Sequence, residues 1–134
     1  MILPDLPKKN KKEEADFGIV FRRWWETSNM VGPFELKDSR GEDSIPFSEV
    51  SDEQLKIALR AKTPEGVLVR VIRGTIGTAD YIGFRNSPSW IVIRFPDCFC
   101  IIDAKRFSDE KETSPRKSLT SRRAQEIAEK VINT

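Results

Sequence analysis

The chain has 134 residues, a length typical of one domain, so a second catalytic domain is excluded. Hydrophobic residues make up 38% of it, including three Trp and eight Phe, which is enough for a compact core. The sequence has no histidine, which excludes serine-histidine triads, histidine-dependent nucleases and almost all tightly bound zinc or haem sites. A net charge of +2 is too small to identify a partner. Any catalysis must therefore use carboxylates, lysine or a hard metal ion.

The N-terminal part of the chain divides into an arm and a helix. Residues 1–12 carry prolines and a lysine cluster without hydrophobic periodicity, which predicts a flexible basic arm. Residues 13–27 place apolar side chains three and four positions apart, which predicts an amphipathic helix with Trp24 in the core. Trp25 falls about 100° further around that helix and could be exposed, in which case it could stack on unpaired bases or contact a dimer partner. We treat residues 13–134 as a single domain.

A short strand and a second helix are expected next. Residues 34–38 alternate apolar and charged side chains, so Glu35 and Lys37 share one face of a strand while Phe34 and Leu36 share the other. Ser51 and Gln54 have the spacing of a capping box, which predicts a helix that ends near residue 61.

The second half of the chain is predicted to be rich in strands. Strands are expected at residues 67–72, 80–84, 90–95 and 99–103, and their short connections predict an antiparallel meander. Cys98 and Cys100 would share a strand face about 7 Å apart at the backbone, beyond disulfide reach, so we expect reduced core residues. Residues 108–117 read as a polar loop, and a C-terminal helix is predicted from Thr120 to Val131.

The sequence Glu35-Leu36-Lys37, on a strand between two helices, resembles the PD-(D/E)XK nuclease superfamily. Its flanks, Ile45-Pro46-Phe47 and then a helix bearing Gln54, are similar to RecU-type Holliday junction resolvases and related small phage proteins. The resemblance implies an α/β fold: a small restriction-endonuclease-like domain in which a mixed β-sheet is flanked by helices. It implies that Glu35 binds Mg²⁺ or Mn²⁺, that Lys37 orients or deprotonates the attacking water, and that Gln54 faces the active site. For Gln54, the capping box is the alternative role.

The family's second metal-binding acid has no obvious counterpart. In the family an aspartate precedes the E-x-K strand, whereas only a helix precedes Glu35 here. Candidate replacements are Glu14 or Asp16 on the first helix, and Asp80 at the start of a later strand. The alternative roles are an ordinary turn residue for Asp80 and a complement to the helix dipole for Glu14.

A second match to the superfamily name is misleading. Pro96-Asp97 precedes Asp103-Ala104-Lys105, but six residues along one strand separate the two aspartates by about 20 Å, too far to share a magnesium ion. We therefore expect Pro96-Asp97 to form a turn, and Asp103 and Lys105 to mark the point where a buried strand leaves the core.

Two basic clusters are candidate contacts for a phosphate backbone, with solubility as the alternative role. They comprise Lys8, Lys9, Lys11 and Lys12 near the N-terminus, and Arg116, Lys117, Arg122 and Arg123 near the C-terminus. The resemblance implies DNA as substrate, branched DNA in particular, and a homodimer. No apolar run approaches the roughly 20 residues of a membrane helix, and no signal-peptide core is present. We therefore expect no membrane partner and a cytoplasmic location. For a phage-encoded protein, this would be the cytoplasm of the host.

Three functions follow from these patterns. The first is a magnesium-dependent DNA endonuclease of the resolvase type. The second is a catalytically impaired nucleic-acid-binding module of the same fold. The third is a small protein-interaction domain in which Glu35 and Lys37 form only a surface ion pair.

Overall fold

The computed structural model describes residue 25 and residues 28–73 and 78–133, with backbone but not side chains for residues 70–73 and 78–80. The predicted basic arm, almost all of the predicted first helix, and the candidate acids Glu14 and Asp16 lie outside these described residues.

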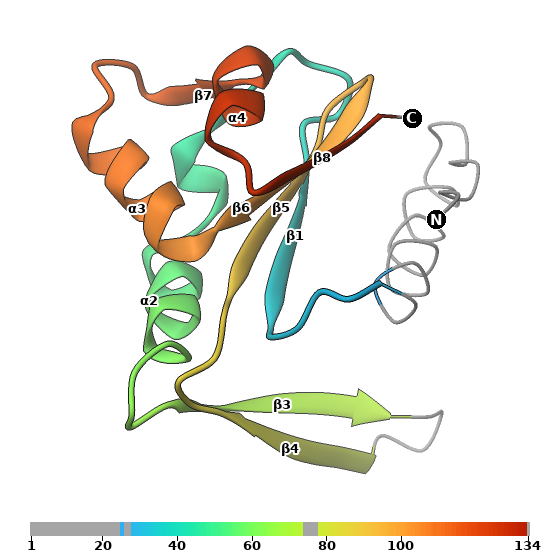
Figure 1. Ribbon diagram of the computed structural model, residues 1–134, viewed down its shortest axis with the longest axis vertical. Helices are drawn as coiled ribbons and strands as arrows, with labels where there is room; N and C mark the ends of the chain where they lie inside the picture. Colours follow the sequence, from blue (N-terminus) through green and yellow to red (C-terminus); the bar gives the residue numbers. More distant parts are fainter. Residues whose placement is uncertain (1–24, 26–27, 74–77, 134) are drawn as a thin grey trace.

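A four-stranded mixed sheet forms the centre of the described structure (Figure 1). Its strand order is β1 (Phe34–Asp38), β5 (Trp90–Arg94), β6 (Cys98–Asp103) and β8 (Lys130–Asn133). β1 runs parallel to β5, whereas β6 is antiparallel to both β5 and β8. A parallel pair cannot be joined by a tight turn, so the chain between β1 and β5 must cross over, and this crossover carries the second helix.

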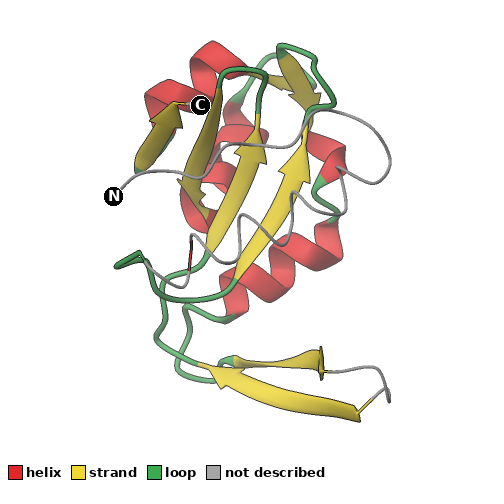
Figure 2. Ribbon diagram, turned by 90° about the vertical axis from the view of Figure 1, so that its right-hand side faces the viewer, coloured by secondary structure: helices red, strands yellow, loops and turns green. Residues whose placement is uncertain are grey.

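All three α-helices of the described residues cover the same face of this sheet (Figure 2). They are α2 (Asp52–Arg60), α3 (Ala104–Thr113) and α4 (Ser121–Ile127). Buried aliphatic, aromatic and cysteine side chains of β5, β6 and the helices form the core between the two layers. None of the helices in the described ranges has an apolar stretch long enough to span a bilayer. The molecule is thus a mixed α/β protein with helices packed on a mixed sheet.

Cys98 and Cys100 confirm the expectation for the cysteine pair. Both are free and buried in this core, with their sulfur atoms 3.9 Å apart. Burial, and then the neighbouring Cys98 thiol, raise the pKa of Cys100 far above its ordinary range, so it stays a neutral thiol.

The opposite face of the sheet carries a second apolar cluster. Val92, Phe99 and Ile101 are buried there together with Trp25, whose ring lies 4.5 Å from that of Phe34 between centroids. Of the two alternatives for Trp25, the structure therefore shows burial and not exposure. Because β5 and β6 are apolar on both faces, the sheet needs cover on both, and the Trp25 ring contributes to it.

Two short elements and a hairpin complete the description. β2 (Ser44–Pro46) pairs antiparallel with β7 (Ser118–Thr120), and a 3-10 turn, η1 (Phe47–Glu49), follows β2. β3 (Val67–Arg73) and β4 (Thr78–Phe84) form an antiparallel hairpin that projects away from the sheet (Figures 1 and 2).

The predicted meander is correct only for the two hairpins. β3 pairs with β4 and β5 pairs with β6, but the fifth strand takes β1 rather than β4 as its other neighbour. The reason is burial: all but the first residue of β5 are buried, so this strand requires a neighbour on each edge inside the main sheet.

The C-terminal third differs most from the sequence-based expectation. The predicted polar loop at 108–117 is mostly helix, because Asp103 caps α3 by accepting bonds from the backbone N–H groups of Lys105 and Arg106. The predicted final helix ends at Ile127, and Lys130–Asn133 instead pairs with β6 as β8. Pairing with the edge of β6 satisfies backbone groups that a longer helix would leave exposed at that edge.

A bidentate ion pair joins α3 to α4. Glu110 is only 7% exposed, and its two carboxylate oxygens accept bonds from Nε and Nη2 of Arg123 at 2.8 and 3.0 Å. Arg123 also donates to Glu126. The hydrogen bonds from Arg123 hold the pKa of Glu110 below its ordinary value despite the opposing effect of burial.

This depressed pKa predicts an acid-dependent stability. The pair contributes stability above the unfolded-state pKa of Glu110, and the contribution is lost as pH falls through the lower, folded-state value. We expect Glu110→Gln to lower the free energy of unfolding near neutral pH and to flatten its decline between about pH 5 and pH 3. Urea denaturation across that range measures both effects. Equal pH dependence in the variant and the wild type would contradict the assignment.

Candidate functional site

Glu35 and Lys37 lie side by side on β1. Strand alternation places both on the face that carries the helices, and their register partners Ile91 and Ile93 belong to the core beneath those helices. Nζ of Lys37 lies 3.5 Å from Oε1 of Glu35. The side chains are 19% exposed for Lys37 and 35% exposed for Glu35, so the pair remains accessible from solvent.

Gln54 reaches the same carboxylate from another element. It lies in the first turn of α2, and its Nε2 donates to Oε1 of Glu35 at 3.0 Å. One oxygen of Glu35 therefore faces two donors, from β1 and from α2. Within the described residues, both of these contacts of Glu35 are made through Oε1.

Gln54 also completes the predicted capping box. The backbone N–H of Ser51 donates to Oε1 of Gln54 at 3.0 Å, and the backbone N–H of Gln54 donates to Oγ of Ser51 at 3.1 Å. The capping box is thus confirmed, and the same side chain also contacts Glu35: the carbonyl end of the amide accepts from Ser51 and the amino end donates to Glu35.

The second acid of the predicted metal site falls outside the described side chains. Asp80 lies on β4 opposite Val71, and only its backbone is described. Glu14 and Asp16 are outside the described residues. Within the described side chains, no group of three or more His, Cys, Asp or Glu residues is placed to hold a metal ion. Glu35 is the carboxylate that the described structure brings to Lys37 and Gln54.

The misleading match at Asp103 has a structural explanation. Phe95 and Cys98 bond through their backbones across the turn at Pro96-Asp97, as expected. Asp103 ends β6, caps α3 and forms an ion pair with Lys62, while Lys105 pairs with Asp109. These side chains are occupied by structural contacts.

The C-terminal basic cluster divides into free and bound side chains. Arg116 and Lys117 are exposed, and the side chain of Arg122 is 93% exposed with a weak contact of 4.0 Å to Glu126. Arg123 is held by Glu110 in the bidentate pair. Sequence reasoning did not identify Glu110 as a partner; its position three residues after Phe107, on the inner face of α3, was the available signal. The four lysines of residues 8–12 lie outside the described residues.

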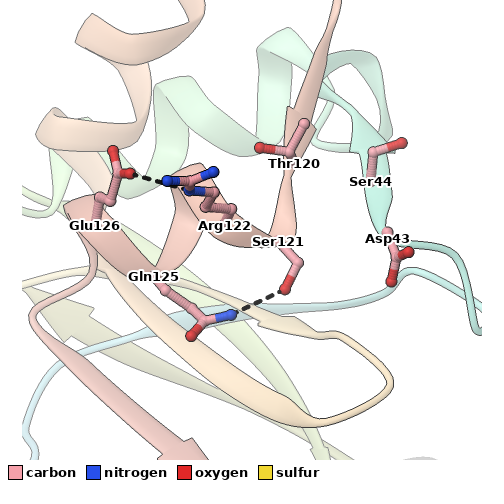
Figure 3. A pocket seen from close by; sticks show the side chains of 7 residues that line it. All are labelled: Asp43, Ser44, Thr120, Ser121, Arg122, Gln125 and Glu126. Carbon is pink, nitrogen blue, oxygen red and sulfur yellow. Dashed lines mark hydrogen bonds and ion pairs between the residues drawn. The ribbon is translucent and has the colours of Figure 1, made fainter.

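An open pocket lies away from Glu35, where β2, β7 and the start of α4 meet (Figure 3). It is lined by Asp43, Ser44, Thr120, Ser121, Arg122, Gln125 and Glu126. Figure 3 shows that its polar groups contact one another: Gln125 donates to Ser121 at 3.1 Å, and Arg122 faces Glu126. None of the lining residues is buried, so the pocket lacks the desolvated polar groups that would select a ligand.

Comparison with known proteins gives no relative. The chain matches no protein-family model, no curated protein and no solved structure.

Proposed function

We propose that this protein is a magnesium-dependent DNA endonuclease with a restriction-endonuclease-like domain. The observation that carries the proposal is the convergence of Lys37 Nζ and Gln54 Nε2 on a single oxygen of Glu35. Residues from two separate elements meet there in the combination that the resemblance to PD-(D/E)XK nucleases implies.

The geometry suits a hard metal ion held partly by substrate. Magnesium keeps several waters and is commonly bound by one or two carboxylates together with substrate phosphate oxygens. With Oε1 of Glu35 fixed by two donors, Oε2 offers one ligand position. A bound Mg²⁺ or Mn²⁺ would lower the pKa of a bound water and neutralise charge on the phosphate. The ammonium of Lys37, beside that carboxylate, can hold the attacking water or a phosphate oxygen.

The position of β1 supports a large substrate. In the described structure, this strand lies at one end of the sheet and pairs only with β5. A site on an edge strand can be approached by a double helix, which a site in the middle of a covered sheet cannot. A mixed sheet covered by helices is also compatible with the restriction-endonuclease-like architecture.

Branched DNA and a homodimer belong to the same proposal. Cutting both strands of a junction symmetrically requires two sites, and a chain of 15.4 kDa with one Glu35-Lys37 pair supplies one. A two-fold dimer is the simplest assembly that provides the second site.

Replacement of Glu35 tests the proposed activity. We expect the purified protein to cleave branched, nicked or linear DNA with Mg²⁺ or Mn²⁺, and Glu35→Gln to reduce the rate on the order of 100-fold or more. The control is Glu53→Gln, the same chemical change at an exposed position of α2, which should cleave as the wild type does. Chelation should abolish cleavage.

The outcomes separate the three functions. Cleavage that survives both Glu35→Gln and chelation would contradict the proposed site. DNA binding without cleavage in either metal would replace the proposal with a binding module. Absence of both binding and cleavage would favour a protein-interaction domain.

The candidates for the second acid are Glu14, Asp16 and Asp80, although β4, which carries Asp80, pairs with β3 in the projecting hairpin and not with β1. We expect alanine at the true partner to abolish cleavage while DNA binding stays equal or tightens, because a negative charge facing phosphate is removed. Cleavage assays beside binding titrations of the three single variants measure this. Full activity in all three would show that Glu35 acts without any of these acids.

The free C-terminal basic side chains should contribute electrostatic DNA affinity. We expect the combined change of Arg116, Lys117 and Arg122 to glutamine to reduce the slope of log affinity against log salt by about 2 to 3, without changing sequence preference. Lys105→Gln, on the exposed side of α3, is the control. An unchanged slope in the triple variant would assign these residues to solubility.

A further inference from the structure

Resting on the proposed function, we propose that the backbone N–H of Ser51 is a positioning group of the site. By binding Oε1 of Gln54, it turns the amino end of that amide toward Glu35. Gln54 then acts as a hydrogen-bond donor to the carboxylate and not as a metal ligand through its own oxygen.

The chemistry of the two partners fixes this orientation. A backbone N–H only donates, so the carbonyl end of the Gln54 amide must face Ser51. An ionised carboxylate only accepts, so the amino end must face Glu35. A flipped amide would lose both bonds, at 3.0 Å each, and would place its oxygen against the carboxylate. Both contacts therefore favour the same orientation of the Gln54 side-chain amide.

The helix that carries Gln54 is itself fixed to the sheet. Leu55 and Ala58 are buried on the inner face of α2. The buried hydroxyl of Ser89, at the residue before β5, donates to the backbone oxygen of Ala58 at 2.6 Å. Because these contacts hold α2 on the sheet, the remaining freedom of Gln54 lies in its side-chain torsions, and the Ser51 N–H restricts these.

The backbone at Ser51 allows this N–H to be removed by substitution. Ser51 has φ −64° and ψ 157°, values that proline adopts without strain, and Val50 has φ −91° and ψ 106°, an extended conformation tolerated before proline. Ser51→Pro removes the hydroxyl and the N–H, whereas Ser51→Ala removes the hydroxyl alone. The difference between the two variants isolates the N–H, and Ser51→Thr should retain both groups.

The first measurement does not depend on nuclease activity. In ¹H–¹⁵N NMR spectra, the Gln54 side-chain amide signals of Ser51→Ala and Ser51→Thr should stay at their wild-type positions. Those of Ser51→Pro should move toward the positions of exposed glutamine side chains. Identical Gln54 signals in Ser51→Ala and Ser51→Pro, with both proteins folded, would overturn the inference.

The second measurement is the rate of DNA cleavage. We expect the rate of Ser51→Pro to fall about tenfold below that of Ser51→Ala, toward the rate of Gln54→Ala, as for loss of one hydrogen bond to a charged group. Equal rates in Ser51→Pro and Ser51→Ala would overturn the inference. If the wild type does not cleave, the proposed function fails and the NMR comparison alone decides the role of Ser51.

The Gln54→Glu variant tests whether the side chain of Gln54 acts as a hydrogen-bond donor or as a metal ligand. Glutamate at this position still forms a capping box with Ser51, so the helix is retained, but its carboxylate cannot donate to Glu35. We expect the cleavage rate to fall at least as far as in Gln54→Ala, because two carboxylates would then face each other in place of a donor and an acceptor. Wild-type cleavage by Gln54→Glu would show that an oxygen at this position suffices, which would overturn the donor role.

Discussion

The parallel pairing of β1 with β5 is the constraint on which the rest of the described structure depends. A parallel neighbour requires a crossover, and the crossover between these strands contains β2, α2 and the β3–β4 hairpin. The crossover lays α2 on the same face of the sheet as Glu35 and Lys37, so a glutamine 19 positions further along the chain reaches the carboxylate. An antiparallel hairpin at this point would have left no room for the helix between the two strands.

The use of Gln54 shows how helix stability and site geometry can share one side chain. A capping box ordinarily satisfies two backbone donors at a helix start, and the N-cap side chain typically contributes about 1 kcal/mol to the stability of the fold. Here the glutamine amide has a second end, and that end faces Glu35. A glutamate in its place would satisfy the helix equally well, so the helix alone gives no reason for the amide. The amino group has its own partner, and that partner is the candidate site.

Ion pairs elsewhere in the structure contribute unequally to its stability. The exposed pair between Lys105 and Asp109 lies in a region where ion pairs contribute little. The pair between Glu110 and Arg123 joins two helices, satisfies both oxygens of a buried carboxylate and would leave an uncompensated charge if it were broken. This pairing also changes the surface, because it commits one arginine of the basic cluster to the fold and leaves Arg116, Lys117 and Arg122 exposed.

The sequence by itself determined the local features whose causes are local. Alternation along residues 34–38 placed Glu35 beside Lys37, the spacing of Ser51 and Gln54 predicted the capping box, and the apolar run around Cys98 and Cys100 predicted buried thiols. Only the tertiary structure decided which strand pairs with β1, where the C-terminal residues leave the helix for the sheet, and that Trp25 is buried. Those outcomes depend on residues far away in the chain. A sheet that is apolar on both faces needs a paired strand on each edge of its central strands, and other elements packed on each face. Periodicity within a segment carries no information about the needs of the whole sheet. For the same reason it could not show that Gln54 contacts Ser51 and Glu35 with opposite ends of one amide.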